Sequence, residues 1–150
     1  MKKKVLVTIL GLATLLHGYP ALAAENPQNT IRVSTRPALV GLWGMLIPEN
    51  KKCTEYYNFK SNNHVFIRSG EEQSYGVYDY QPTLDPKLSP AFLGLHIRYE
   101  NNQKDCSGIQ EDQSGEVSRV AVVWHNPSHI SFCLEDRPEE CFASLKRVRP

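Results

Sequence analysis

The sequence comprises 150 residues, 22% of them charged, with a formal net charge of +1 at pH 7. A chain of this length is sufficient for one domain around one hydrophobic core. Because 16 acidic residues balance its 17 basic ones, it lacks the basic excess that contact with phosphates requires, and we expect no nucleic-acid partner.

The first 24 residues have the pattern of a cleavable signal peptide. Lys2 to Lys4 precede an apolar run from Val5 to Leu16, and Ala21 to Ala23 provide the small residues of a cleavage site. That run is shorter than the roughly 20 apolar residues that cross a bilayer as a helix. No cysteine stands at the cleavage site, where a lipoprotein would carry its lipid. We expect a mature protein without a membrane span, in the periplasm or secreted.

The mature chain divides into an arm and one domain. Residues 25–38 are polar and lack periodicity, so we predict an extended N-terminal arm there and a single domain over residues 39–150. Cleavage removes three of the 17 basic residues, which leaves 14 against 16 acidic residues and a formal charge of −2.

From Leu39 onward, short apolar segments alternate with turn-forming residues, and no segment keeps a helical period. The segments predict eight strands, at 39–46, 53–59, 64–69, 73–81, 91–100, 117–125, 129–135 and 141–148. Between them lie turn and loop formers such as "SNN", "SGEE" and "DRPEE".

Apolar and polar residues alternate most clearly in three of these strands, so that one face of each is apolar. The apolar sets are Leu95, Ile97 and Tyr99; Val120, Val122 and Trp124; and Ile130, Phe132 and Leu134. This pattern is typical of antiparallel strands that cover one interior. Mostly short connections favour an eight-stranded up-and-down barrel, which has no exposed edge, and a two-sheet sandwich is the alternative.

Four cysteines, Cys53, Cys106, Cys133 and Cys141, lie in the predicted domain. An even number in an oxidising compartment indicates two disulfides, for which three pairings exist. If the strands alternate up and down, all four cysteines fall at the same end of the barrel. Proximity favours Cys133 with Cys141 across one hairpin, which leaves Cys53 with Cys106.

The first predicted strand contains "GLW", Gly41 to Trp43, and the chain finishes with "LKRVRP". This arrangement resembles the lipocalin-like, or calycin-type, barrels. The resemblance implies that Trp43 closes one end of the barrel and that Arg147 or Arg149 packs over its ring. Gly41, Trp43 and Arg147 would then form a structural lock.

Aromatic residues are the candidate ligand contacts inside such a barrel. The candidates are Trp43, Tyr57, Tyr78, Tyr99 and Trp124. Phenols that line a cavity favour an amphipathic molecule, whereas phenols that point outward from adjacent strands make a protein-binding face. A third reading is that these rings simply fill the core, because an eight-stranded barrel is only just wide enough to hold side chains.

The loops at the cysteine-bearing end carry ten acidic and four basic side chains. Glu71, Glu72, Glu139 and Glu140 are our candidates for an acidic rim that attracts a cationic protein, with solubility as the simpler explanation.

No motif in the sequence indicates catalysis. It has no nucleophile elbow, no glycine-rich phosphate loop and no metal-binding histidine spacing. His125 and His129 flank a tight turn and can approach each other, but histidines at hairpins are usually solvated. We predict a non-enzymatic, monomeric binding protein without a cofactor or metal, which holds a small apolar or amphipathic molecule. The alternative is a non-enzymatic protein-interaction module, an inhibitor of a cationic hydrolase or an envelope-stress factor, that uses the acidic rim.

Overall fold

A computed structural model describes residues 39–48, 50–84 and 89–149. The chain divides into two units, residues 1–33 and 34–150, and all described residues belong to the second. The predicted signal peptide and N-terminal arm lie outside the described residues. In the part that is described, no helix has the length and apolar character needed to cross a membrane.

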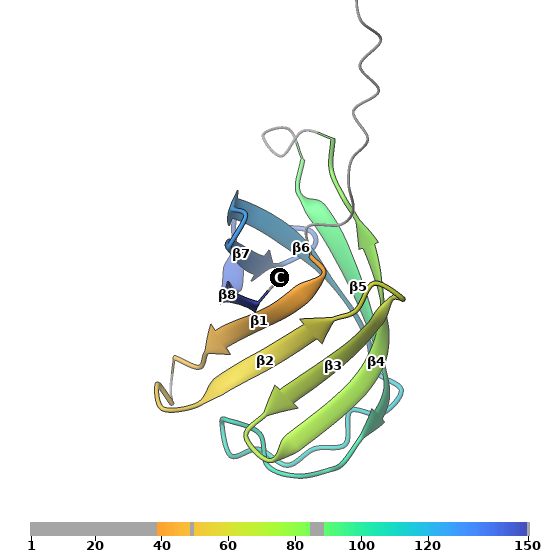
Figure 1. The fold of residues 1–150 in the computed structure, drawn as a ribbon, viewed down its shortest axis with the longest axis vertical. Helices are drawn as coiled ribbons and strands as arrows, with labels where there is room; N and C mark the ends of the chain where they lie inside the picture. The colour runs from red at the N-terminus through yellow and green to blue at the C-terminus, as the bar shows by residue number, and fades with distance from the viewer. Residues whose placement is uncertain (1–38, 49, 85–88, 150) are drawn as a thin grey trace, which may run out of the picture. The chain divides into compact units, whose positions relative to one another are not determined.

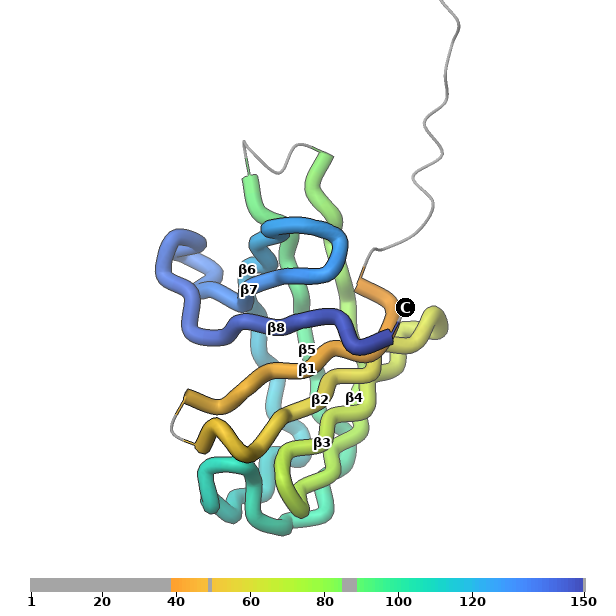
Figure 2. Tube along the Cα trace, turned by 60° about the vertical axis from the view of Figure 1, so that its left-hand side comes forward, coloured from red at the N-terminus to blue at the C-terminus, as the bar shows by residue number. Residues whose placement is uncertain are grey.

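The described residues form an eight-stranded antiparallel barrel. Each strand pairs with the next in sequence, and β8 pairs with β1 to close the sheet (Figures 1 and 2). The fold class predicted from the sequence is therefore confirmed, and the sandwich alternative is excluded. The strands are β1 (Gly41–Leu46), β2 (Thr54–Phe59), β3 (His64–Ser69), β4 (Glu72–Gln81), β5 (Ala91–Glu100), β6 (Val117–Asn126), β7 (His129–Cys133) and β8 (Cys141–Arg149).

The up-and-down order gives the barrel two distinct ends. We call the "loop end" the one formed by the β1–β2, β3–β4, β5–β6 and β7–β8 connections. The opposite end, where β1 begins and β8 finishes, is the "Trp43 end". The seven connections between consecutive strands therefore alternate between the two ends, four at the loop end and three at the Trp43 end.

The core runs through the centre of the barrel. Its side chains come from the inward-facing positions of the strands, as period-two alternation requires. The fully or nearly fully buried members are Leu39, Trp43, Phe59, Val65, Tyr78, Ala91, Leu93, Val122, Ile130, Phe132 and Leu145.

A β-bulge interrupts the pairing of β4 and β5. Gly76 pairs with Ile97 and Tyr75 pairs with Tyr99, so that Arg98 is the additional residue. Gly76 is required here, because a Cβ atom at this position would overlap the carbonyl oxygen of His96.

The bulge changes which side chains of β5 face the interior. Beyond it, Glu100 is buried and pairs with Ser74, whereas Tyr99 points outward with 60% of its surface exposed. The prediction that Tyr99 shares the inner face with Leu95 and Ile97 is therefore wrong. The prediction fails because the additional residue of the bulge switches the face of the sheet to which each later side chain of β5 points.

The β5–β6 connection, residues 101–116, packs against the β3–β4 turn. The backbone NH groups of Glu71 and Glu72 both donate to the Lys104 carbonyl oxygen, at 3.0 and 3.1 Å. Gly70 opens this turn with a φ of 62° and allows the close approach, because a Cβ atom there would lie 3.0 Å from the backbone of Asp105.

Two disulfides hold the loop end. Cys53 is joined to Cys106, which ties the β1–β2 connection to the β5–β6 connection, and Cys133 is joined to Cys141 across the β7–β8 connection. This is the pairing that proximity favoured, and all four sulfurs lie at the predicted end. Two disulfides are consistent with an oxidising environment outside the cytoplasm.

Candidate functional site

The start of β1 builds the Trp43 end. Gly41 has a φ of 133°, which favours glycine, and is followed two residues later by the fully buried Trp43. The indole Nε1 donates a hydrogen bond to the carbonyl oxygen of Leu39 at 2.8 Å. The polar atom of this large side chain is therefore satisfied inside the core.

Arg147 covers the Trp43 ring. Its guanidinium carbon lies 4.2 Å from a ring centroid, and its Nη1 and Nε donate to the carbonyl oxygens of Val40 and Pro127 at 2.8 and 3.0 Å. Burial lowers the pKa of Arg147 from its usual value. Of the two arginines that the resemblance offered, Arg147 makes the contact, whereas Arg149 is exposed and pairs with Leu42.

A second tryptophan extends the aromatic cluster from Trp43. Trp124 packs edge-on against Trp43, with ring centroids 5.7 Å apart, and its Nε1 donates to the Tyr80 hydroxyl at 2.8 Å. Burial raises the pKa of Tyr80. Both tryptophans predicted as ligand contacts thus point inward, and they touch each other.

Four further rings continue through the barrel. Phe59 packs edge-on against Tyr78 with centroids 5.0 Å apart, and Tyr57 packs in the same way against Phe132 at 5.6 Å. The Tyr78 hydroxyl donates to the carbonyl oxygen of Lys60 at 2.7 Å. Tyr57 and Tyr78, predicted from the sequence as inward-facing candidates, therefore do face the interior.

Tyr57 lies where the aromatic interior meets polar groups. Its hydroxyl donates to the Glu55 carboxylate. Burial, the Glu55 charge with this hydrogen bond, and the Glu72 charge raise the pKa of the Tyr57 phenol well above its usual value. The phenol is therefore neutral at physiological pH, and the residue as a whole is half-buried.

The loop end contains two buried carboxylates, of which the sequence predicted Glu72 only as part of the exposed rim and Glu100 not at all. Glu72 and Glu100 are 7% and 5% exposed. The Ser74 hydroxyl donates to Glu72 at 3.0 Å, and the backbone NH groups of Asn102 and Gln113 donate to Glu100 at 3.0 and 2.6 Å. Period-two counting from Tyr78 along β4 would have placed Glu72 inside.

The electrostatic consequence appears at Glu72. Burial raises the pKa of its carboxyl, the hydrogen bond from Ser74 opposes that effect, and the charges of Glu100 and Glu55 raise the pKa further. The interior of the barrel is therefore apolar towards Trp43 and acidic at the loop end.

Some inward-facing apolar side chains are only half-buried. They pack against the core and yet keep part of their surface exposed. They are Met45, Tyr57, Ile67, Tyr80, Leu95, Val120, Trp124 and Ala143.

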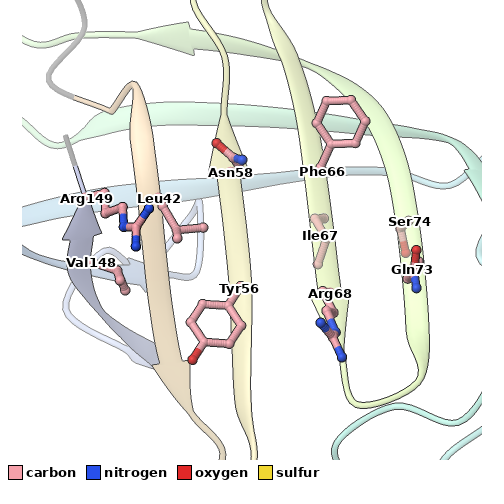
Figure 3. A pocket seen from close by; sticks show the side chains of 10 residues that line it. All are labelled: Leu42, Tyr56, Asn58, Phe66, Ile67, Arg68, Gln73, Ser74, Val148 and Arg149. Carbon is pink, nitrogen blue, oxygen red and sulfur yellow. The ribbon is translucent and has the colours of Figure 1, made fainter.

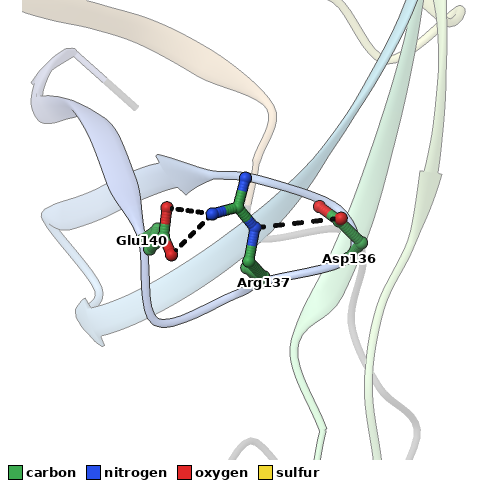
Figure 4. A network of polar contacts seen from close by, with 3 residues as sticks. All are labelled: Asp136, Arg137 and Glu140. Carbon is green, nitrogen blue, oxygen red and sulfur yellow. Dashed lines mark hydrogen bonds and ion pairs between the residues drawn. The ribbon is translucent and has the colours of Figure 1, made fainter.

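The predicted acidic rim is only partly present. Glu72 does not belong to it, because its side chain is buried inside the barrel. Both carboxylate oxygens of Glu140 accept from Arg137 Nη1 at 2.7 Å, and Arg137 Nε also lies 3.8 Å from Asp136 Oδ2 (Figure 4). Glu71 and Glu139 are exposed. Arg137 therefore offsets part of the negative charge in the β7–β8 connection.

The tyrosines divide between the two sides of the wall. Tyr57, Tyr78 and Tyr80 face inward, while Tyr56 and Tyr99 are 37% and 60% exposed on the outside. The sequence left both orientations open for this group of phenols, and the barrel contains both.

The two histidines at the β6–β7 turn do approach each other. The ring centroids of His125 and His129 lie 4.5 Å apart. The Nε2 atom of His125 lies 2.9 Å from the Ser131 hydroxyl, and the Nε2 atom of His129 lies 2.8 Å from the Ser144 hydroxyl. Among the described residues, no group of three or more His, Cys, Asp or Glu side chains is arranged to hold a metal ion.

The fold and interior define a small, closed, eight-stranded antiparallel barrel with an arginine-capped tryptophan at one end. Comparisons with protein-family models, with curated proteins and with solved structures find no match.

Proposed function

We propose that this protein is an exported, non-enzymatic binding protein of lipocalin-like architecture that holds a small apolar or amphipathic molecule inside the barrel. The molecule would lie between Trp43 and the loop end. The observation that carries the proposal is the half-buried apolar lining of the inner wall, which includes Tyr57, Leu95 and Trp124. Apolar surface left exposed costs about 25 cal/mol per Å², and a guest that covers it recovers this free energy.

The polar groups of the interior define which guests fit. The hydroxyls of Tyr57 and Ser74 donate their protons to Glu55 and Glu72, so they offer acceptor oxygens next to apolar walls, which favours an amphipathic guest that carries a donor. The carboxylates of Glu55, Glu72 and Glu100 disfavour an anionic group at the loop end. The proposed guest is therefore neutral or cationic.

Native mass spectrometry of the mature protein, purified from its own cells, tests the proposal first. A retained small-molecule adduct is the expected result. Titration with N-phenyl-1-naphthylamine, a neutral apolar fluorophore, provides the second readout, because its emission rises when it leaves water.

A matched pair of variants locates the binding. Ala143 faces inward beside Phe132, whereas its neighbour Ser144 is exposed on the outer surface. Ala143→Phe should weaken fluorophore binding tenfold or more, and Ser144→Phe should leave it unchanged, with near-UV circular dichroism to verify that both fold. Equal binding by the wild type and Ala143→Phe would contradict the proposal.

A further inference from the structure

A groove of about 510 Å³ lies on the outer surface of the barrel, across β8, β1, β2, β3 and β4 (Figure 3). Its lining includes the half-exposed Tyr56, Phe66 and Val148, together with Leu42. These residues alternate with the inward-facing Trp43, Tyr57 and Arg147, so their side chains lie on the outside of the wall. Ile67 and Ser74, at inward-facing positions, also border the groove. Its volume falls in the range of about 300 to 1,000 Å³ that is typical of small-molecule sites.

The second glycine of the "GLWG" segment helps to form this groove. Gly44 faces outward between Tyr56, its partner on β2, and Val148 of β8. A Cβ atom on Gly44 would lie 3.3 Å from Val148 Cγ2 and 3.5 Å from Tyr56 Cε1. The missing side chain lets both neighbours lean over the backbone of β1.

The register of four strands places two arginines on this groove. Arg149, Leu42, Asn58 and Phe66 are successive cross-strand partners on β8, β1, β2 and β3, and Arg68 pairs with Tyr56 in the adjacent row. The two arginines thus lie on strands three spacings apart, roughly 14 Å across the sheet, and Arg68 lies two residues further along its strand than the row of Arg149. Such a separation lets the two long side chains approach one molecule from opposite sides.

The charge of this surface is unlike that of the loop end. Arg68 and Arg149 are exposed, and neither forms an ion pair with any residue in the ranges 39–48, 50–84 and 89–149. The outward-facing positions of β8, β1, β2 and β3 carry these arginines and Lys146 but no acidic side chain. Two unpaired guanidinium groups beside aromatic rings are complementary to an anion with an apolar body.

We propose that this outer groove binds one dissolved molecule of an anionic amphiphile, with a hydrocarbon or aromatic body and a carboxylate, sulfate or phosphate group. The apolar body lies between Tyr56, Phe66 and Val148, and the anionic group contacts Arg68 or Arg149. A peptide strand cannot add to this sheet, because the closed barrel has no free edge. Tyr56 and Phe66 line a hollow of about 510 Å³, a volume typical of small-molecule sites, which favours a single molecule over a bilayer surface.

Decanoate, kept well below its micellar concentration, is the probe. Isothermal titration calorimetry with the mature, disulfide-bonded protein should give one bound molecule. Backbone amide NMR shifts should change at Leu42, Tyr56, Phe66 and Arg68 and not at the inward-facing Val122 or Leu145. Decanamide, which has the same chain without the charge, should bind at least tenfold more weakly.

Three variants test the residues. Arg68→Gln with Arg149→Gln should weaken decanoate binding at least tenfold, whereas Lys146→Gln, which removes one charge from the same outer surface outside the groove, should change it less than twofold. Gly44→Val should weaken binding by displacing Tyr56 and Val148. Ala143→Phe, which fills the interior, should leave decanoate binding unchanged, so failure of the interior site and failure of the groove are distinguishable.

Several outcomes would overturn the proposal. One is the absence of decanoate binding to the wild type, and another is wild-type affinity in the double arginine variant. A third is a set of NMR shifts confined to inward-facing residues. Phosphatidylglycerol vesicles are the last probe. If the vesicles bind through Arg68 and Arg149 while dissolved decanoate does not bind, the surface contacts a membrane instead of a single molecule.

Discussion

The two ends of the barrel are held together in different ways. At the Trp43 end, side chains distant in sequence meet directly, since Arg147 covers Trp43 and donates to the carbonyl oxygens of Val40 and Pro127. At the loop end, two disulfides and backbone hydrogen bonds to Lys104 fix the long connection, while the interior carries Glu72 and Glu100.

The difference shows where this barrel derives its stability and where it tolerates polar groups. The Trp43 end stabilises itself by packing, because its largest side chain is fully buried with its nitrogen satisfied. The loop end includes the buried Glu72, whose raised pKa means that its charged form opposes folding, and covalent links offset this cost. We therefore expect substitutions at the two ends to affect stability through separate mechanisms.

The largest effect is expected at Trp43. Trp43→Ala removes a fully buried ring, its hydrogen bond to Leu39 and the ring beneath Arg147, so the free energy of unfolding should fall by about 3 to 5 kcal/mol. Urea unfolding under oxidising conditions measures it. Tyr99→Ala, which truncates an exposed ring, should cost less than about 1 kcal/mol. Equal losses in the two variants would contradict the assignment of Trp43 to the core.

The next effect concerns the disulfide that spans 53 residues. Cys53→Ser with Cys106→Ser should lower the free energy of unfolding by about 3 to 4 kcal/mol, because the denatured chain gains freedom. Cys133→Ser with Cys141→Ser opens a separation of only 8 residues and should cost roughly 2 to 3 kcal/mol.

Hydrogen exchange distinguishes local from general loosening in these variants. Without the Cys53–Cys106 bond, amides of residues 101–116 should exchange faster, while Trp43 and its neighbours keep their protection. Uniform acceleration over the whole barrel would show that the two ends are not independent.

A smaller effect is expected at the bulge beside the loop end. Gly76→Ala forces a Cβ atom against the carbonyl oxygen of His96 and should destabilise the protein by roughly 1 to 3 kcal/mol. Gly94→Ala is the matched control on the neighbouring strand, because its Cβ would lie 3.9 Å from the Asp79 oxygen. Thermal unfolding of both variants measures the difference, and similar midpoints would refute the steric argument.

The sequence was sufficient to predict the strands and their order because both depend on local signals. Alternation and turn-forming residues placed all eight strands within one or two residues of their observed bounds, and the cysteines supported the up-and-down order. The contact between Trp43 and Arg147 was accessible only through the resemblance to a known family, because it joins the first strand to the last.

The sequence was insufficient wherever a side chain's direction depended on pairing. Tyr99 was assigned to the interior by alternation, but the bulge opposite Tyr75 and Gly76 turns it outward. Glu72 was assigned to a loop, although it is the first inward-facing residue of β4. The outer groove depends on a register that brings Arg149, Leu42 and Asn58 into one row, and no local pattern encodes it.

The smallest effect follows from the carboxylates of the loop end. The pKa of Glu72 is raised above its ordinary value of 4.5 by burial and by the charges of Glu100 and Glu55. A carboxyl with a raised pKa in the folded state binds its proton more tightly there. Its stabilising contribution is therefore complete below pH 4.5 and is lost as the pH rises through the raised value.

Glu72→Gln removes this pH dependence, because the amide keeps an acceptor for Ser74 without a charge. The variant should be more stable than the wild type at pH 7, and the two should converge as the pH falls below 4.5. Urea midpoints measured from pH 3.5 to 8 test this, with Glu71→Gln, at an exposed neighbouring position, as the control that should show no such trend. A variant less stable than the wild type at pH 7 would mean that the Glu72 carboxylate stabilises the loop end, and the contrast between the two ends would then rest on the disulfides alone.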